Sequence, residues 1–116
     1  METRALSRSG LDVSRLLLGC GNFGGIGSAP ELFGQGESEE AAFELMDTAI
    51  AAGITMFDTA DAYGGGRSEA MIGRWLAERS PEPRPLLSTK VYNPMGEGED
   101  RGLAAARVLR QLDSRP

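Results

Sequence analysis

Apolar residues along the chain occur in two patterns, continuous runs and a helical spacing, and each pattern predicts a different secondary structure. Three short apolar runs have the length and continuity of parallel strands buried on both faces: residues 15–19, 54–57 and 86–91. Between and after these runs, apolar residues recur at the spacing of one helix face, in the segments 38–52, 69–79 and from 102 onward. A strand and a helix that alternate three times predict an α/β protein with right-handed βαβ units and a parallel sheet.

Capping signals mark the ends of the predicted helices. Ser38 is a good N-cap for the first helix, and Gly53 is typical of the residue just after a helix. Ser68 is the expected N-cap of the second helix, which Pro81 stops. With these boundaries, the following side chains are expected to face the core: Ala42, Leu45, Met46, Ala49 and Ile50 from the first helix, Met71, Ile72, Trp75 and Leu76 from the second, and Ala105, Val108, Leu109 and Leu112 from the third.

Turns and loops are expected in three places. Residues 3–13 alternate loosely around Ser9-Gly10, which favours a short β-hairpin before the main fold. Residues 19–36 are rich in glycine and contain Pro30, so they are expected to form a loop, as are residues 93–102.

The spacing Gly19-x-Gly21-x-x-Gly24 leaves open a second interpretation, a Rossmann-type nicotinamide-binding protein. That fold places a helix directly after the glycines and an acidic residue about 20 residues further on. Here the next helical pattern starts near residue 38, and the acid that closes the next strand is Asp58. We therefore expect the glycine spacing to be accidental, and a helix directly after Gly24 would favour the Rossmann alternative.

Composition narrows the class of protein. The 116 residues fit one domain over 1–116, and the formal net charge of −5, with basic residues scattered singly, argues against a nucleic-acid-binding or acidic-membrane surface. One cysteine, Cys20, permits no intrachain disulfide and no Cys-rich metal site, and it is expected to be buried as a small hydrophobe. The N-terminus lacks the apolar core of a secretory signal, so a cytoplasmic protein without a membrane anchor is expected.

Side chains suited to proton transfer are expected to meet at one edge of the sheet. Asn22, Asp58, Tyr63 and Lys90 each follow or close a predicted strand, and parallel strands end on the same side. A lysine ammonium near a phenol favours the phenolate, and a carboxylate beside the lysine keeps it charged and oriented. Tyr63 would then donate a proton to a carbonyl oxygen as hydride arrives at the carbon.

The segment 54–73 resembles the signature of the aldo-keto reductases, in which Phe-Asp-Thr-Ala is followed by Tyr-Gly, Glu and Gly at set spacing. The resemblance implies the N-terminal part, about three βα units, of a (β/α)8 TIM barrel that reduces an aldehyde or ketone with NADPH. It implies catalytic roles for Asp58, Tyr63 and Lys90, with Tyr63 as proton donor. It also places Gly21 and Asn22, with Asp58, at the cofactor, and it implies no metal.

The resemblance also shows what the 116 residues lack. A barrel of this type takes about 250 residues, and the family's catalytic histidine after strand four has no counterpart, because the sequence contains no histidine. We therefore expect weak cofactor binding and little or no turnover from the isolated chain. The remaining alternative is a truncated, non-catalytic barrel fragment that acts through self-association at its open sheet edges or by complementation.

Taken singly, each candidate residue has a structural interpretation. Asp58 is suited to cap a loop, Tyr63 to lie half-buried and Lys90 to be solvated; only the joint spacing favours a site. Asp61 is expected to be a solvated loop residue, and Glu69 to be an anion in the first turn of a helix.

Overall fold

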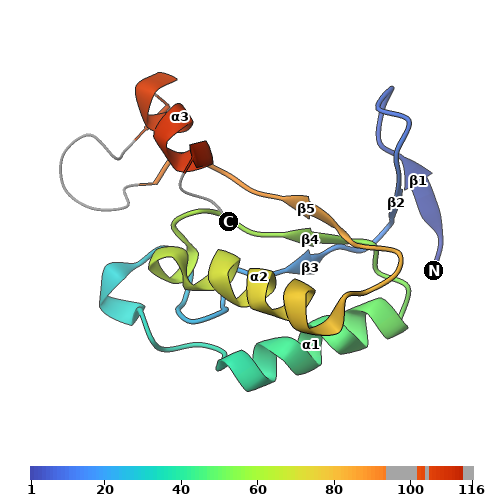
Figure 1. Cartoon of the computed structure of the whole chain (residues 1–116), viewed down its shortest axis with the longest axis horizontal. Helices are drawn as coiled ribbons and strands as arrows, with labels where there is room; N and C mark the ends of the chain where they lie inside the picture. The colour runs from blue at the N-terminus through green and yellow to red at the C-terminus, as the bar shows by residue number, and fades with distance from the viewer. Residues whose placement is uncertain (94–101, 104, 114–116) are drawn as a thin grey trace.

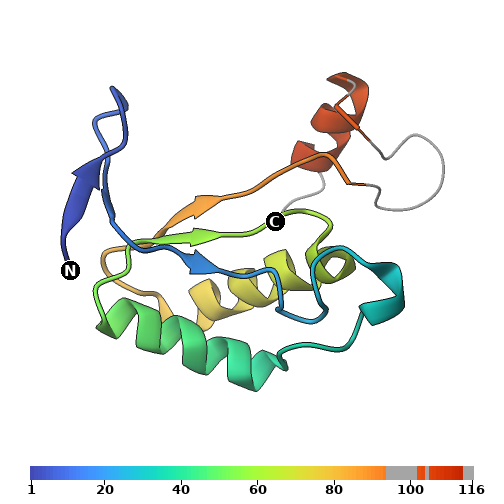
Figure 2. The same ribbon diagram turned by 180° about the vertical axis from the view of Figure 1, so that it is seen from behind.

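A three-stranded parallel sheet forms the centre of the computed structural model, which describes residues 1–93, 102–103 and 105–113. The strands β3 (Leu18–Gly19), β4 (Met56–Asp58) and β5 (Leu86–Ser88) lie in that order, with Leu18 opposite Phe57 and Phe57 opposite Leu87. The helices α1 (Glu39–Ala51) and α2 (Arg67–Arg79) lie on the same side of this sheet (Figures 1 and 2). The predicted alternation of parallel strands and helices is confirmed.

A separate hairpin precedes the sheet. The strands β1 (Thr3–Ala5) and β2 (Asp12–Ser14) pair antiparallel, and the hairpin lies at the amino-terminal end of the three parallel strands (Figure 1). Gly10 has a positive φ in the turn, as the Ser9-Gly10 pair predicts. The predicted hairpin is confirmed.

The first strand is much shorter than the apolar run that predicted it. Leu16 and Leu17 are 60% and 47% exposed, so the expectation of a strand over 15–19 buried on both faces is wrong. The reason lies in Ser14, whose hydroxyl donates to the backbone carbonyl of Leu16 and accepts from the backbone N–H of Thr55. Because the Ser14 side chain makes these hydrogen bonds with the backbone, the chain turns at this point and does not extend the β-ladder.

Helix α1 begins and ends where its capping residues predict. The Ser38 hydroxyl accepts from the backbone N–H of Ala41, and Gly53 has φ +92° just past the last turn. The inward face is shifted slightly from the expected one, because Phe43 is buried whereas Leu45 is 42% exposed. The expectation that Leu45 faces the core is wrong.

Helix α2 begins two residues before its expected start. Gly66, in a left-handed conformation, is its N-cap, and Ser68 lies inside the first turn and is fully buried. The Ser68 hydroxyl donates to the backbone carbonyl of Cys20 and shares a 2.8 Å hydrogen bond with Thr59. Ser68 therefore connects three elements instead of capping one, and the expected N-cap is wrong.

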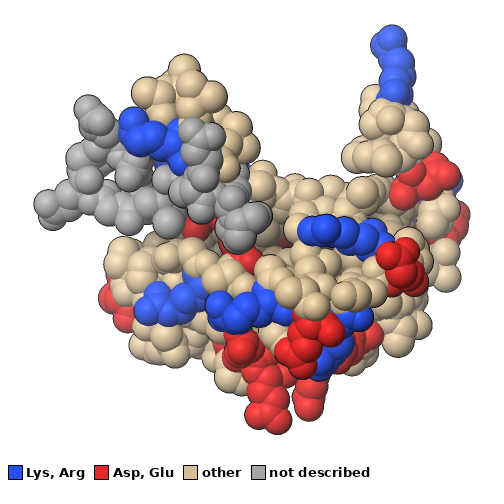
Figure 3. All heavy atoms as spheres, viewed as in Figure 1, with Lys and Arg blue, Asp and Glu red and all other residues tan. Residues whose placement is uncertain are grey.

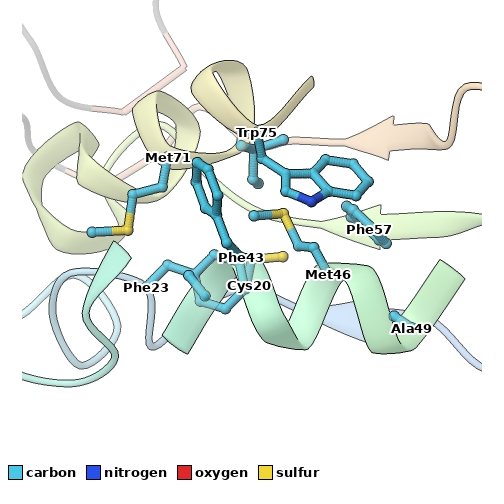
Figure 4. Packing of buried hydrophobic residues seen from close by; sticks show 10 residues of the cluster. Cys20, Phe23, Phe43, Met46, Ala49, Phe57, Met71 and Trp75 are labelled. Carbon is cyan, nitrogen blue, oxygen red and sulfur yellow. The ribbon is translucent and has the colours of Figure 1, made fainter. Parts of the chain in front are cut away.

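The core lies between the sheet and the two helices. Phe43 and Met46 from α1 face Met71 and Trp75 from α2, and Cys20, Phe23 and Phe57 also belong to the cluster (Figure 4). The rings of Phe57 and Trp75 lie 5.4 Å apart between centroids, a favourable tilted arrangement. Cys20 is fully buried, as expected.

Ion pairs connect the exposed faces of the two helices. Arg74 pairs with Glu39, and Arg79 pairs with Asp47 at 3.2 Å. Acidic and basic side chains are interspersed on the side of the molecule shown in Figure 3. Such exposed pairs contribute little to stability, about 0–1 kcal/mol each, so packing of the apolar faces holds α1 against α2.

The third helix, α3 (Ala105–Asp113), lies beyond the carboxyl end of β5 (Figure 1). Its expected inward face is wrong, since Leu109 and Leu112 are 61% and 57% exposed and Ala105 is exposed as well. Among the side chains of α3 that the structure describes, Arg107 is buried instead, in an ion pair described below. Of the loop expected over 93–102, residues 94–101 lie outside the described part of the chain.

The Rossmann alternative is excluded by the segment after Gly24. That segment contains only a short 3-10 turn, η1 (Pro30–Leu32), before α1 begins at Glu39. The loop expected over 19–36 is therefore present, and no helix follows Gly24 directly. In the described part of the chain, no helix has the length and apolar character needed to cross a membrane.

Candidate functional site

The register of the sheet determines which side chains face away from the helices. Phe57 packs into the core, so Asp58, the next residue of β4, points to the opposite face. Asp58 lies opposite Ser88, and backbone hydrogen bonds beyond the strand ends, from Thr59 N–H to Ser88 and from Asp61 N–H to Lys90, continue the pairing. Lys90, two residues after Ser88, therefore lies on the same face as Asp58.

Lys90 holds the site together. Its Nζ donates to Asp58 Oδ2 at 2.9 Å, to the backbone carbonyl of Thr59 at 2.8 Å and to Tyr63 Oη at 3.3 Å. Its Nζ also lies 4.9 Å from the centroid of the Tyr63 ring. The structure thus brings together three residues that lie in separate segments of the sequence.

The charge of Lys90 is stabilised by these contacts. Partial burial lowers the pKa of the ammonium, but hydrogen bonds to Asp58 and Tyr63 outweigh this effect and hold the pKa above its ordinary value of 10.5. Lys90 is therefore a cation at neutral pH and faces the phenol oxygen with its positive charge.

Tyr63 begins the 3-10 turn η2 (Tyr63–Gly66), which joins β4 to α2. Gly64 and Gly65 have φ values of +62° and +67°, a conformation that other residues rarely adopt. A Cβ on Gly64 would lie 2.8 Å from the backbone oxygen of Phe23, so the turn packs directly on the loop after β3. This close backbone contact fixes the position of the Tyr63 backbone relative to the loop after β3.

The loop after β3 supplies the two residues expected at a cofactor. A Cβ on Gly21 would lie 3.8 Å from the Tyr63 ring, so Gly21 is adjacent to the phenol. The side chain of Asn22 is exposed, and its backbone carbonyl accepts from Glu37 N–H at 2.7 Å. Gly21 thus lies beside Tyr63, and Asn22 follows it in a loop held by backbone hydrogen bonds.

A buried thiol lies directly behind the site. Burial raises the pKa of Cys20 to about 12, with Asp58 adding to the rise and Lys90 opposing it. Cys20 is thus an uncharged thiol at neutral pH and serves packing, while its backbone carbonyl accepts the Ser68 hydroxyl.

Asp61 is the clearest residue that sequence interpretation misjudged. Instead of a solvated loop residue it is 2% exposed, and it pairs at 2.9 Å with the fully buried Arg107 of α3. The small apolar residues Ala60 and Ala62 on either side of Asp61 are the sequence signal that could have indicated burial. Both alanines are buried in the structure as well. Glu69 does lie in the first turn of α2, as expected, and accepts from Thr89 Oγ1.

Comparison with known proteins identifies a family that matches most of the chain. The model of the aldo/keto reductase family matches residues 15–114. An uncharacterized oxidoreductase of Bacillus subtilis, YrpG, is 38% identical over 97% of this chain and 35% of its own length. A versiconal hemiacetal acetate reductase of Aspergillus parasiticus is 39% identical over 98% of this chain and 38% of its own length.

Solved structures give the same result for the fold. A holo-form aldo-keto reductase from Bacillus halodurans has a TM-score of 0.73 and 29% identity, over 97% of this chain and 34% of its own. A glycerol dehydrogenase from Gluconobacter oxydans has a TM-score of 0.70 and 27% identity, over 96% of this chain and 33% of its own. The chain spans about a third of the length of each of these four relatives.

Proposed function

Because the chain belongs to the aldo/keto reductase family, we propose that its Asp58–Tyr63–Lys90 cluster transfers the proton in an NADPH-dependent reduction of an aldehyde or ketone to an alcohol. Tyr63 is the proton donor in this proposal. The observation that supports it most directly is the Lys90 ammonium, which contacts both the phenol oxygen and the Asp58 carboxylate.

Each residue has a distinct role in the proposed reaction. When bound, NADPH supplies the hydride that reduces the carbonyl carbon. Tyr63 Oη donates its proton to the carbonyl oxygen, and the adjacent Lys90 ammonium stabilises the phenolate that remains. Asp58 holds Lys90 charged and in place through a 2.9 Å hydrogen bond. A proton from solvent then restores the phenol.

The loop after β3 fits a cofactor beside Tyr63. A Cβ at Gly21 would lie 3.8 Å from the Tyr63 ring, so glycine keeps a side chain out of the space beside that ring. We propose that Gly21, Asn22 and Asp58 border the nicotinamide. The preference for NADPH over NADH rests on the family resemblance.

The 116 residues carry this proton-transfer cluster but span about a third of their relatives. The catalytic histidine of the family has no counterpart in the sequence. We therefore propose that the isolated chain binds NADPH weakly and turns over little or nothing.

A chimera tests the proposed function. The chain replaces the matching third of YrpG, and NADPH oxidation is followed at 340 nm with 4-nitrobenzaldehyde and a panel of other aldehydes and ketones. Tyr63→Phe should slow the reaction by about 100-fold or more, the range for loss of a general acid. Tyr92→Phe is the matched control, because Tyr92 is 63% exposed and is not one of the three residues of the cluster.

Two results would contradict the proposal. One is a Tyr63→Phe chimera with native circular dichroism and the parent's rate. The other is a folded parent chimera that shows no NADPH-dependent turnover with any carbonyl tested. Measurable turnover by the isolated chain, abolished in Tyr63→Phe, would contradict only the expected inactivity of the 116 residues alone.

A further inference from the structure

Building on the proposed role of Tyr63, we propose that Arg107 is a positioning residue: its buried guanidinium holds the loop that carries Tyr63 against Lys90. Arg107 belongs to α3, a helix distant in sequence from the proton-transfer cluster. Its hydrogen bonds within the described part of the chain go to Asp61, Asn93 and Gly102, so it acts on the catalytic side chains through Asp61.

Arg107 joins three segments at the carboxyl end of the sheet. One guanidinium nitrogen, Nη2, donates to Asp61 Oδ2 at 2.9 Å and to the backbone carbonyl of Asn93 at 2.8 Å. The other terminal nitrogen, Nη1, donates to the carbonyl of Gly102 at 2.9 Å. The loop after β4, the segment after β5 and the residues just before α3 thus converge on one side chain.

The same cluster extends to the loop after β3. The side-chain amide of Asn93 donates to Ser28 Oγ at 2.9 Å, while its backbone carbonyl accepts from Arg107. Gly21 lies earlier in the loop that carries Ser28, and the backbone N–H of Gly27 donates to the Gly21 carbonyl at 2.7 Å. Arg107 is therefore linked by hydrogen bonds to the loop after β3, which contains Gly21, and to the loop after β4, which carries Tyr63.

Asp61 transmits the constraint to the site. Its carboxylate is held by Arg107, and its backbone N–H donates to the Lys90 carbonyl at 3.1 Å. Tyr63 follows two residues later, and its backbone N–H donates to the Ala60 carbonyl at 3.4 Å. Fixing Asp61 at both ends therefore fixes the distance between the Tyr63 and Lys90 backbones.

The pattern of hydrogen bonds favours positioning over simple stabilisation. Arg107 and Asp61 expose 0% and 3% of their side chains, and a buried ion pair often stabilises a fold no better than apolar residues would. The Arg107 Nε is buried and has no hydrogen-bond partner among the described residues. The guanidinium is thus oriented by the loops that it joins, and this orientation leaves one N–H unsatisfied.

A single-residue label can test this directly in the 116-residue chain. Lys90 is the one lysine in the sequence, so a lysine-selective ¹³C label reports on that side chain alone. Because Lys90 Nζ lies over the Tyr63 ring, the chemical shift of its ε-CH2 group depends on where that ring is. Tyr63→Leu provides the reference shift without the ring.

Arg107→Met should move the ε-CH2 signal at least halfway toward the Tyr63→Leu value. Arg110→Met, on the exposed part of the same helix, is the matched control and should leave the signal at the parent position. Trp75 fluorescence in urea establishes that each variant is folded under the conditions of the spectrum. If Arg107→Met does not fold, the double variant Asp61→Asn/Arg107→Met removes both buried charges together and is measured in its place.

A folded Arg107→Met or double variant whose Lys90 signal stays at the parent position would overturn the inference, even if its urea midpoint falls. That result would leave Arg107 as an anchor for α3 only. The measurement uses neither NADPH nor a carbonyl, so failure of the proposed reaction in the chimera and failure of the positioning role are separate outcomes.

Discussion

Lys90 Nζ lies 3.3 Å from Tyr63 Oη and 4.9 Å from the centroid of the Tyr63 ring. The ammonium therefore donates a hydrogen bond to the phenol oxygen, and in the proposed reaction it would stabilise the phenolate that remains after Tyr63 gives up its proton. Asp58, at 2.9 Å from the same nitrogen, keeps the lysine charged. Because Lys90 is the one lysine in the sequence, NMR of lysine-labelled protein can follow this side chain alone.

The Lys90 pKa should lie above 10.5 in the folded chain and fall toward that value in Asp58→Asn. Titration of ¹³C-labelled Lys90 by NMR measures both. Since the folded pKa is the raised one, the stabilisation is fully present below the ordinary pKa and is lost as pH rises through the folded value. The pair is partly exposed, so its contribution to the free energy of unfolding should be small, about 0–1 kcal/mol. Glu39→Gln, at an ion pair on α1, should leave the Lys90 titration unchanged.

Cys20 should resist alkylation by iodoacetamide at pH 8 until the chain unfolds. Burial raises its pKa from 9.0 to about 12, so the folded state retains the thiol proton to higher pH than the unfolded state does. Stability should consequently fall as pH rises between these two values. Urea unfolding should show that the free energy of unfolding falls less in this alkaline range for Cys20→Ala than for the parent. Rapid alkylation of the folded chain at pH 8 would show that Cys20 is accessible.

The parts of the fold that follow from local pattern were predictable from sequence. The hairpin turn at Ser9-Gly10, the Ser38 cap and the alternation of strands and helices along the chain each follow from adjacent residues. The meeting of Asp58 and Lys90 follows from parallel topology, because strand ends of one sheet lie on one side. No long-range contact had to be known.

Two of the errors, at Ser68 and Asp61, arise where a polar side chain has a partner that is distant in the sequence. Ser68 is a residue type suited to an N-cap, but its hydroxyl instead makes buried hydrogen bonds to Cys20 and Thr59 across elements. Asp61 is polar and lies in a loop, and only its pairing with Arg107, 46 residues later, makes burial favourable. Helical periodicity carries no information about such partners.

Trp75 should be among the most sensitive positions for stability. It is 1% exposed, packs on Phe57, and donates from Nε1 to Asp47 Oδ1 at 2.8 Å. Trp75→Ala should lower the free energy of unfolding by about 3–5 kcal/mol, or leave the chain unfolded. Asp47→Ala leaves the buried indole N–H without this partner and should lower it by about 1–3 kcal/mol.

Leu45→Ala is the control for these two variants. Its side chain is 42% exposed on the same helix as Asp47, so the change in the free energy of unfolding in urea should stay within about 0.5 kcal/mol. A larger loss at Leu45 than at Asp47 would mean that α1 packs with the face expected from its periodicity alone and not with the face that buries Phe43.

Two glycines that differ in their surroundings should respond to alanine with opposite signs. Gly64 has φ +62°, and an added Cβ would lie 2.8 Å from the Phe23 carbonyl oxygen, so Gly64→Ala meets both backbone strain and a backbone clash. The strain alone costs about 1–2 kcal/mol. Gly73 lies inside α2 with nothing within 4 Å of an added Cβ, so Gly73→Ala should stabilise by about 0.5–1 kcal/mol.

Urea unfolding monitored by Trp75 fluorescence measures both substitutions. Gly64→Ala should in addition move the Lys90 ε-CH2 signal, because the turn that it strains begins at Tyr63. Gly73→Ala should leave that signal in place, since α2 continues unchanged through residue 73. Equal stability of the two variants would show that the η2 turn does not need a left-handed backbone at Gly64, and the packing of this turn on the loop after β3 could then not be what orients Tyr63.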